Sequence, residues 1–280
     1  MKPIFITGAT GNIGSFVSTN LREKGVPIRL GMRNPDKMNS HEVHFDFSDS
    51  STYRDAVEGC SAVFLLRPPA IANTKQTLNI FIDEAYAAGV EHIVFVSVTG
   101  ADNNSIVPHH AVEQKLKQSG KSYTILRPGF FSQNLGDAYR EDIQVDDRIY
   151  LPSAMGLINF IDARDIGEVA VNALMHSKDH INGEYTLVGQ QAVTFADVAK
   201  LLSKELNRPI QYKAASILGY WMHLRCKKMP LMKVIVQTVL HAGIRKGQAH
   251  YTDDTIVKLL GRSPRTIQNY IRDNISLWND

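Results

Sequence analysis

Short apolar runs alternate with amphipathic stretches through the first half of the chain. The runs predict strands at residues 2–7, 27–32, 43–47, 62–66, 92–98 and 123–127. The stretches between them carry apolar residues at helical spacing and predict helices at 13–24, about 52–58, 73–88 and 110–119. Strands that alternate with helices indicate an α/β fold with a doubly wound parallel sheet covered on both faces.

The pattern changes after Pro128. Residues 160–169 predict an extended piece that enters a helix, with Asp165 as its cap and Glu168 three positions on. A strand at 184–188 and an amphipathic helix at 194–207 follow, and residues 209–280 are expected to be mostly helical. We expect residues 1–130 and about 158–190 to form the main domain. A smaller α/β lobe takes about 131–157 and 191–280.

Composition narrows the class of protein. The 280 residues are 44% hydrophobic and 21% charged, which is ordinary for a globular protein with a sizeable core. The first strand begins almost at Met1, which leaves no room for a signal peptide, and no apolar run is long enough to span a bilayer. Cys60 and Cys226 form no metal or redox motif. A cytoplasmic location without membrane association is therefore predicted.

Charge is distributed unevenly along the chain. The net charge of +3 is too small to predict direct nucleic-acid binding. From Leu206 to Thr252, however, there is no Asp or Glu, and eight basic residues occur: Arg208, Lys213, Arg225, Lys227, Lys228, Lys233, Arg245 and Lys246. This segment is either a surface for an anionic partner or, as we expect, a solvated face balanced by acids from elsewhere in the fold.

Three glycines directly after the first strand carry the strongest chemical signal. Gly8, Gly11 and Gly14 have the spacing Gly-x-x-Gly-x-x-Gly, and Thr10, Asn12 and Ile13 stand between them. Glycines let the backbone turn tightly and approach a ligand. The N-terminus of the following helix offers unpaired N–H groups and the positive end of a dipole. A strand–glycine loop–helix unit therefore predicts a Rossmann-type NAD(P) pyrophosphate site.

In a doubly wound sheet the ligand lies at the carboxyl ends of the strands, so residues that follow each strand are candidate contacts. The second strand ends at Arg33 without a carboxylate, and Lys37 is close by. A basic residue there accommodates a ribose 2′-phosphate, which favours NADP(H) over NAD(H). The further cofactor-binding candidates are Asp46, Phe47, Leu66, Arg67, Ser97, Val98, Pro128 and Phe130. The two phenylalanines fit an ordinary core equally well.

Five motifs together carry a family resemblance: residues 7–14, 33–37, 94–97, 123–131 and 160–166. The chain resembles the NmrA-like, atypical short-chain dehydrogenase/reductases. The resemblance implies a Rossmann domain with a smaller C-terminal substrate lobe. The family includes NAD(P)H-dependent quinone reductases, reductases of plant phenolics, and non-catalytic redox sensors. Nucleotide-sugar epimerases belong to the same superfamily.

One motif of that superfamily is missing. Its catalytic members use Tyr-x-x-x-Lys, and the resemblance aligns Glu113 with a Glu that follows the Lys by four residues. Ser105 and His109 then occupy the Tyr and Lys positions. Epimerising a sugar requires a base that takes a hydroxyl proton, whereas reducing a quinone does not. The sequence therefore favours an NADPH-dependent quinone-type reductase. A sensor acting through a protein partner is the alternative, and an epimerase is disfavoured.

The remaining site predictions depend on placement. His109 is the candidate proton donor, although it and His110 also suit the start of a helix. Ser97 either hydrogen-bonds a substrate carbonyl or simply ends its strand. Thr99, Phe131, Asn134 and Tyr139 are expected to line a pocket for a flat, quinone-like substrate, with Trp221 and Met222 as further candidates. The aromatic residues among them fit an ordinary core equally well. The sequence does not decide between a monomer and a homodimer.

Overall fold

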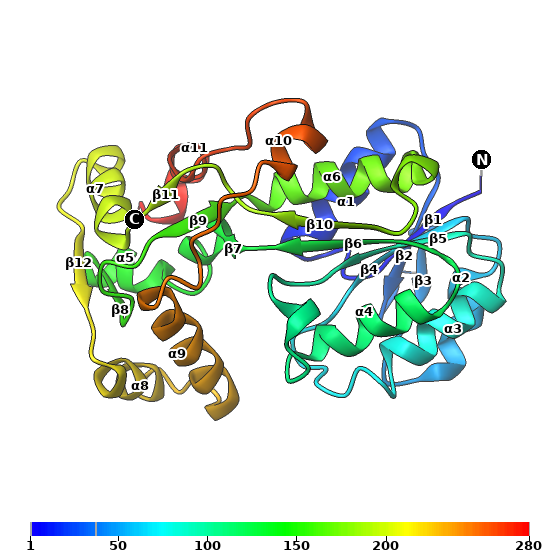
Figure 1. Cartoon of the computed structure of the whole chain (residues 1–280), viewed down its shortest axis with the longest axis horizontal. Coiled ribbons are helices and arrows are strands. Elements are labelled where there is room, and N and C mark those ends of the chain that lie inside the picture. Colours follow the sequence, from blue (N-terminus) through cyan, green and yellow to red (C-terminus); the bar gives the residue numbers. More distant parts are fainter. Residues whose placement is uncertain (1, 37, 280) are drawn as a thin grey trace. The chain divides into compact units, whose positions relative to one another are not determined.

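A computed structural model describes residues 2–36 and 38–279 (Figure 1). Lys37, which the sequence placed near the cofactor, lies outside the described residues. The chain divides into two compact units. The first unit takes Met1–Pro128, Ala163–Leu187 and Lys258–Gly261, and the second takes Gly129–Asp162, Val188–Val257 and Arg262–Asp280.

The first unit is built on a seven-stranded parallel sheet, which confirms the predicted doubly wound fold. In spatial order the strands are β10 (Gly183–Leu187), β6 (Ser122–Pro128), β5 (His92–Val96), β4 (Ala62–Leu66), β1 (Ile4–Ile6), β2 (Ile28–Met32) and β3 (Glu42–His44). The strand β1 pairs with β2 through Ile4 and Ile28, and with β4 through Ile4 and Ala62. The order of the strands reverses at β1, so the switch point lies beside the glycine loop.

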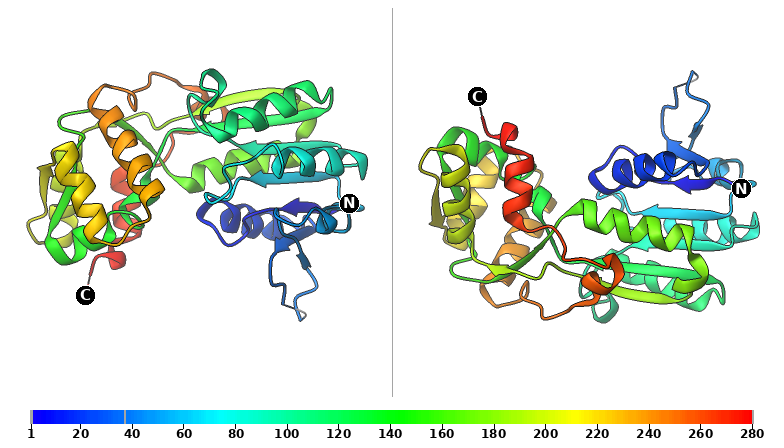
Figure 2. Two further views of the ribbon diagram at one scale, coloured as in Figure 1. Left: turned by 90° about the horizontal axis from the view of Figure 1, so that it is seen from below. Right: turned by 90° about the horizontal axis from the view of Figure 1, so that it is seen from above.

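Helices cover both faces of this sheet (Figure 1). They are α1 (Asn12–Glu23) and α6 (Ala163–Met175) on one face, and α2 (Tyr53–Val57), α3 (Leu78–Ala87) and α4 (Pro108–Gln118) on the other. The helices α1 and α6 run side by side (Figure 2). They approach closely because Gly167 has no side chain: a Cβ there would lie 2.5 Å from Cδ1 of Phe16.

Aromatic packing fills the space between the sheet and the α2–α3 layer. The rings of Phe45 and Phe81 lie 5.0 Å apart, and both contact Phe5 and Tyr53. Three of these pairs are edge-to-face, namely Phe5–Phe45, Phe45–Phe81 and Tyr53–Phe81, and such pairs add stability beyond the area they bury. On β1, Phe5 faces this layer, and its neighbours Ile4 and Ile6 face the opposite one, as expected for a strand buried on both faces.

The structure corrects two sequence predictions in this unit. The third strand ends at His44 instead of Phe47, because Asp46 and Asp49 close a tight turn there. The helix α6 begins at Ala163, so Asp165 is not its cap but a buried residue in its first turn. Other boundaries differ by a few residues; the helix predicted at 73–88 begins only at Leu78.

The second unit combines short strands with helices. The strands are β7 (Phe130–Phe131), β8 (Arg148–Leu151), β9 (Ile158–Ile161), β11 (Ala192–Val193) and β12 (Gln211–Ala214), and β9 belongs here rather than to the main domain. The helices are α5 (Arg140–Asp146), α7 (Phe195–Leu206), α8 (Ile217–Cys226), α9 (Leu231–Arg245), α10 (Thr255–Leu260) and α11 (Ile267–Asp273). Residues 258–260 of α10 group with the first unit.

The second unit has its own core. Phe160, Phe195, Leu202, Tyr220 and Trp278 are among its buried members. The helix α7 begins as predicted, because Thr194 and Asp197 form a reciprocal capping box at its N-terminus. Among the described residues, no helix is both long and apolar enough to cross a membrane.

Candidate functional site

The glycine loop joins the centre of the sheet to α1. Thr7 fixes its start, because its Oγ1 donates to the carbonyl of Phe64 (3.2 Å) and accepts from the N–H of Leu66 (2.8 Å). Gly8 follows with φ +63°, a left-handed conformation that favours glycine. A Cβ on Gly8 would lie 2.9 Å from Cδ2 of Leu66. The loop therefore lies against the carboxyl end of β4, next to the switch point.

Gly14 allows α1 to approach this loop. A Cβ on Gly14 would lie 2.1 Å from the carbonyl oxygen of Gly8, which no side chain can tolerate. The N-cap residue Gly11 contributes no side-chain cap, and no acidic residue stands in the first turn of α1. The positive end of the helix dipole is therefore left for an anion, the arrangement that holds a pyrophosphate in this kind of fold. Thr10 and Asn12 are exposed, whereas the side chain of Ile13 is buried.

Arg33 directly follows β2, one strand away from the glycine loop. Its side chain is exposed and forms no ion pair with the described residues, and its carbonyl accepts from Nδ1 of His44 at 2.9 Å. A planar guanidinium without a carboxylate partner is suited to hold a phosphate. The geometry therefore leaves Arg33 available for the role predicted from sequence.

Asp46 and Phe47 form the turn after β3. The Asp46 carboxylate accepts from the N–H and the hydroxyl of Ser48, and these bonds lower its pKa. The Phe47 ring is buried and packs edge-on against Phe45 and Phe81. The sequence left open whether Phe47 contacts the cofactor or packs in the core, and the structure places its side chain in the core. Only its backbone is left for a cofactor.

Arg67 and His109 form a pair beyond the end of β4. The Arg67 Nε donates to His109 Nε2 at 3.2 Å, and Nη1 donates to three loop carbonyls, of which Ile71 is the nearest at 2.6 Å. Because Nε2 accepts, the proton of the neutral ring must reside on Nδ1. That Nδ1 is buried and has no hydrogen-bond partner among the described residues. The pair therefore presents one unused N–H donor.

The surroundings of His109 disfavour the predicted role as a proton donor. Burial, assisted by the positive charge of Arg67, lowers the pKa of His109 to about 3. The ring is then neutral throughout the physiological range, so it can donate a hydrogen bond but holds no second proton to deliver. His110 is bound separately, through Nδ1 to the carbonyl of Ala101.

This low pKa has a measurable consequence for stability. In the unfolded chain a histidine takes up a proton near pH 6.5, whereas folded His109 does so only near pH 3. The resulting contribution to stability is complete above about pH 6.5 and is lost as the pH falls towards 3. We expect His109→Gln to flatten this part of the pH dependence, measured by urea unfolding at several pH values. An unchanged pH dependence would show that His109 titrates normally.

Ser97 belongs to a buried ion-pair network. Its hydroxyl donates to Glu113 Oε1 at 2.5 Å, and Arg127 binds both Glu113 oxygens at 2.9 and 2.6 Å. Arg127 also contacts Glu184, which Lys117 pairs from the surface side. Ser97 and Glu113 are 2% and 0% exposed. The predicted bond from Ser97 to a substrate carbonyl is therefore corrected, since the hydroxyl proton is already used within the fold.

Several residues predicted to contact the cofactor or substrate lie at the carboxyl ends of β5 and β6. Val98 and Thr99 follow β5 and are partly exposed, and the N–H of Thr99 donates to the carbonyl of Pro128 at the end of β6. This bond brings two of the predicted loops together within the first unit. Ser105, at the Tyr position of the missing dyad, is exposed in the turn before α4.

The predicted residues beyond Pro128 belong to the second unit. Phe130 packs edge-on against Phe160, and Tyr139 is buried with its hydroxyl bonded to Nε2 of His241. Both side chains pack in the core of the second unit, and their predicted contacts with cofactor and substrate stay predictions. Phe131 and Asn134 are partly exposed, and their predicted place in a substrate pocket remains a prediction.

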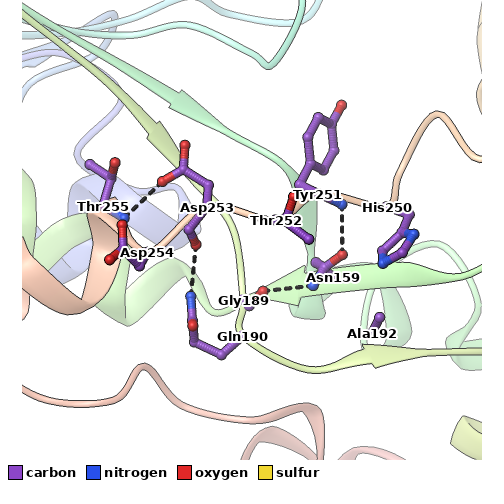
Figure 3. A pocket seen from close by; sticks show the side chains of 10 residues that line it. All are labelled: Asn159, Gly189, Gln190, Ala192, His250, Tyr251, Thr252, Asp253, Asp254 and Thr255. Carbon is purple, nitrogen blue, oxygen red and sulfur yellow. Dashed lines mark hydrogen bonds between the residues drawn. The ribbon is translucent and has the colours of Figure 1, made fainter.

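The second unit also contains a pocket of about 530 Å³ (Figure 3). It is lined by the loop around Gly189 and by residues 250–255. The Asn159 amide donates to the carbonyl of Gly189 and accepts from the N–H of Tyr251, at 2.8 and 2.9 Å. Gln190 donates to the carbonyl of Asp253. These bonds hold the segments together, and no residue predicted from the sequence as a site lines this pocket.

A parallel sheet with its switch point at a glycine loop and an uncapped helix N-terminus defines a Rossmann-type dinucleotide-binding protein. The model of the NmrA-like family matches residues 1–253. The chain therefore belongs to the NmrA-like family.

Named relatives extend over nearly the whole chain. The NAD(P)H azoreductase of Xenophilus azovorans is 31% identical, with 96% of each chain covered. The crystal structure of NADPH-dependent quinone oxidoreductase from Escherichia coli, complexed with NADPH, matches with a TM-score of 0.87 and 25% identity, covering 97% of this chain and 99% of the other. The triphenylmethane reductase of a Citrobacter species, complexed with NADP(H), matches with a TM-score of 0.84 over 97% of this chain and 99% of the other; at 24% identity it shows the fold alone.

Proposed function

We propose that this protein is an NAD(P)H-dependent oxidoreductase that transfers hydride to a quinone or a similar electrophile with delocalised electrons. The observation that carries the proposal is the glycine loop, where Gly8, Gly11 and Gly14 leave the N-terminus of α1 open to a pyrophosphate. The azoreductase and the quinone oxidoreductase among the relatives support this class of acceptor.

The residues around this loop fit a reaction without a side-chain acid. A bound nicotinamide supplies the hydride, and the protein binds and orients the two reactants. Ser97 is committed to Glu113, and His109 is neutral. Reduction of a quinone yields an anion that delocalisation stabilises and water protonates, so no positioned acid is required. His109, held by Arg67 with its proton on Nδ1, acts in this proposal as an uncharged hydrogen-bond donor.

Turnover with defined acceptors tests the proposal. The purified protein, NADPH and a panel of quinones and azo dyes are mixed, and the absorbance of the reduced nicotinamide is followed. We expect oxidation of NADPH with at least one acceptor of this class, and a rate that shows no inflection from His109 between about pH 5 and 8. Tight NADPH binding without turnover would contradict the proposal and favour a redox sensor that acts through a protein partner.

We further propose that NADP(H) is preferred over NAD(H), with Arg33 as the residue that binds the 2′-phosphate. Loss of a charged hydrogen bond to this phosphate weakens binding by ~10- to 100-fold. We therefore expect Arg33→Ala to weaken NADPH binding by this factor and to leave NADH binding nearly unchanged, measured by titration of nicotinamide fluorescence. Arg22→Ala, an exposed arginine on α1, is the matched control. Equal weakening of both cofactors would rule out the 2′-phosphate role.

A further inference from the structure

The helices α8 and α9 expose an unusual amount of apolar surface. On α9, Leu231, Met232, Ile235, Val236, Val239 and Leu240 are between 43% and 68% exposed. On α8 the exposed apolar residues are Ile217, Leu218, Trp221 and Met222. Isolated exposed apolar residues are normal on a protein surface, but a set of this size on two packed helices indicates an interaction site.

The apolar residues of α9 occupy a complete half of the helix. Val234, Thr238 and His241 face the core of the second unit. At 3.6 residues per turn, Met232, Val236 and Val239 lie on the opposite side, and the other exposed apolar residues of α9 flank them. Only Lys233, at the edge of this half, is polar. We name this half of α9 the apolar face.

Several cations lie on α9 or directly beside it in the chain. Acidic residues of other elements neutralise some of the basic residues between Leu206 and Thr252, as expected from the sequence. Lys227 pairs with Glu141 and Asp142, and Arg208 pairs with Asp147. Six further cations of the acid-free segment form no ion pair with the described residues: Lys213, Arg225, Lys228, Lys233, Arg245 and Lys246. Lys228 lies in the turn that joins α8 to α9, and Lys233 lies on α9 itself.

From this combination we infer that the α8–α9 hairpin docks onto an anionic lipid surface. Helices that lie in the membrane interface carry an apolar side that enters the lipid boundary and lysines or arginines that contact anionic headgroups. A second copy of the chain fits less well, because a symmetric contact would bring the unpaired cations together with no carboxylate in the segment. A protein partner would meet this face through a rim of mixed charge, whereas the charges on and beside α9 are all positive, which favours an anionic lipid surface.

This inference departs from the sequence-based prediction of no membrane association, which rested on the lack of a spanning segment. It is independent of the proposed reductase activity, because docking requires neither cofactor nor acceptor.

Vesicle binding tests the inference directly. The protein is mixed with vesicles of phosphatidylcholine alone or of phosphatidylcholine with phosphatidylglycerol, and binding is measured by sedimentation. Trp221 on α8 is 37% exposed, whereas Trp278 is fully buried. A blue shift of the tryptophan fluorescence on vesicle binding therefore comes from Trp221. If this shift disappears in Trp221→Phe, the contact with lipid lies at α8. We expect binding that requires phosphatidylglycerol and weakens with salt.

Variants identify the responsible residues. The double variant Val236→Glu and Val239→Glu should weaken binding by about tenfold or more, and Lys228→Gln and Lys233→Gln by about fivefold each. Ile80→Glu, an exposed apolar residue on α3, is the matched control and should bind as the parent protein does. Circular dichroism verifies folding.

Several results would overturn the inference. One is no binding to either vesicle, and another is equal binding by the glutamate variant. A dimer that the glutamate variant dissociates, without vesicle binding by the parent, would assign the face to a second copy. Loss of acceptor turnover in that variant, again without vesicle binding by the parent, would assign the face to the acceptor.

Discussion

Gly14→Ala should severely weaken dinucleotide binding. The added Cβ would lie 2.1 Å from the carbonyl oxygen of Gly8, so either the loop or the first turn of α1 must move. Both elements hold the anion site, and a small displacement of helix N–H groups removes most of their interaction with a pyrophosphate. We expect NADPH affinity to fall by ~100-fold or more, with a loss of ~1–3 kcal/mol in the free energy of unfolding from overpacking.

Gly25→Ala is the matched control at the other end of the same helix. Gly25 has a φ of +69°, unlike Gly14, and a Cβ there meets nothing within 4 Å. Its substitution should cost about 1–2 kcal/mol of backbone strain and leave NADPH affinity unchanged. If Gly14→Ala bound NADPH as well as Gly25→Ala does, the N-terminus of α1 would not be the pyrophosphate site.

Arg127→Met should cause a large loss of stability, because it leaves a buried carboxylate without its cation. Glu113 is 0% exposed, and Arg127 supplies two of its hydrogen bonds. Breaking such a buried pair typically costs ~3–5 kcal/mol, which urea unfolding measures readily. Breaking the exposed Lys200–Asp197 pair by Lys200→Met should cost less than ~0.5 kcal/mol.

The double variant Glu113→Leu/Arg127→Met distinguishes the cause. It removes both charges, so it should recover part of the stability that Arg127→Met loses. An additive loss in the double variant would show that packing, and not an unpaired charge, accounts for the effect.

Local signals made much of the first unit predictable. The strand Ala62–Leu66 has the same bounds in the prediction and in the structure, because five consecutive apolar residues between polar turns leave no other solution. The resemblance to the NmrA-like family is confirmed by the family match over residues 1–253. The second unit was less predictable: β7 and β11 contain two residues each and carry no periodic pattern.

The chemistry of side chains was less predictable than the fold. Ser97 and His109 have residue types and positions that suit catalysis, and nothing in the local sequence shows that Arg127 and Glu113 lie beside the first and Arg67 beside the second. These contacts join residues 14 to 42 positions apart. They also decide burial, and burial sets the pKa of His109.

The sequence by itself determined that a dinucleotide-type glycine loop follows a central strand, because the turn conformation and the close approach at Gly8 and Gly14 admit only glycine. It also determined that Arg33, and no carboxylate, ends the second strand. Only the tertiary structure decided that the Ser97 hydroxyl is committed to Glu113, that His109 is neutral, and that half of α9 is apolar and exposed. The physical reason is that charge state and exposure depend on neighbours brought together by folding, whereas a backbone conformation depends on the residue itself.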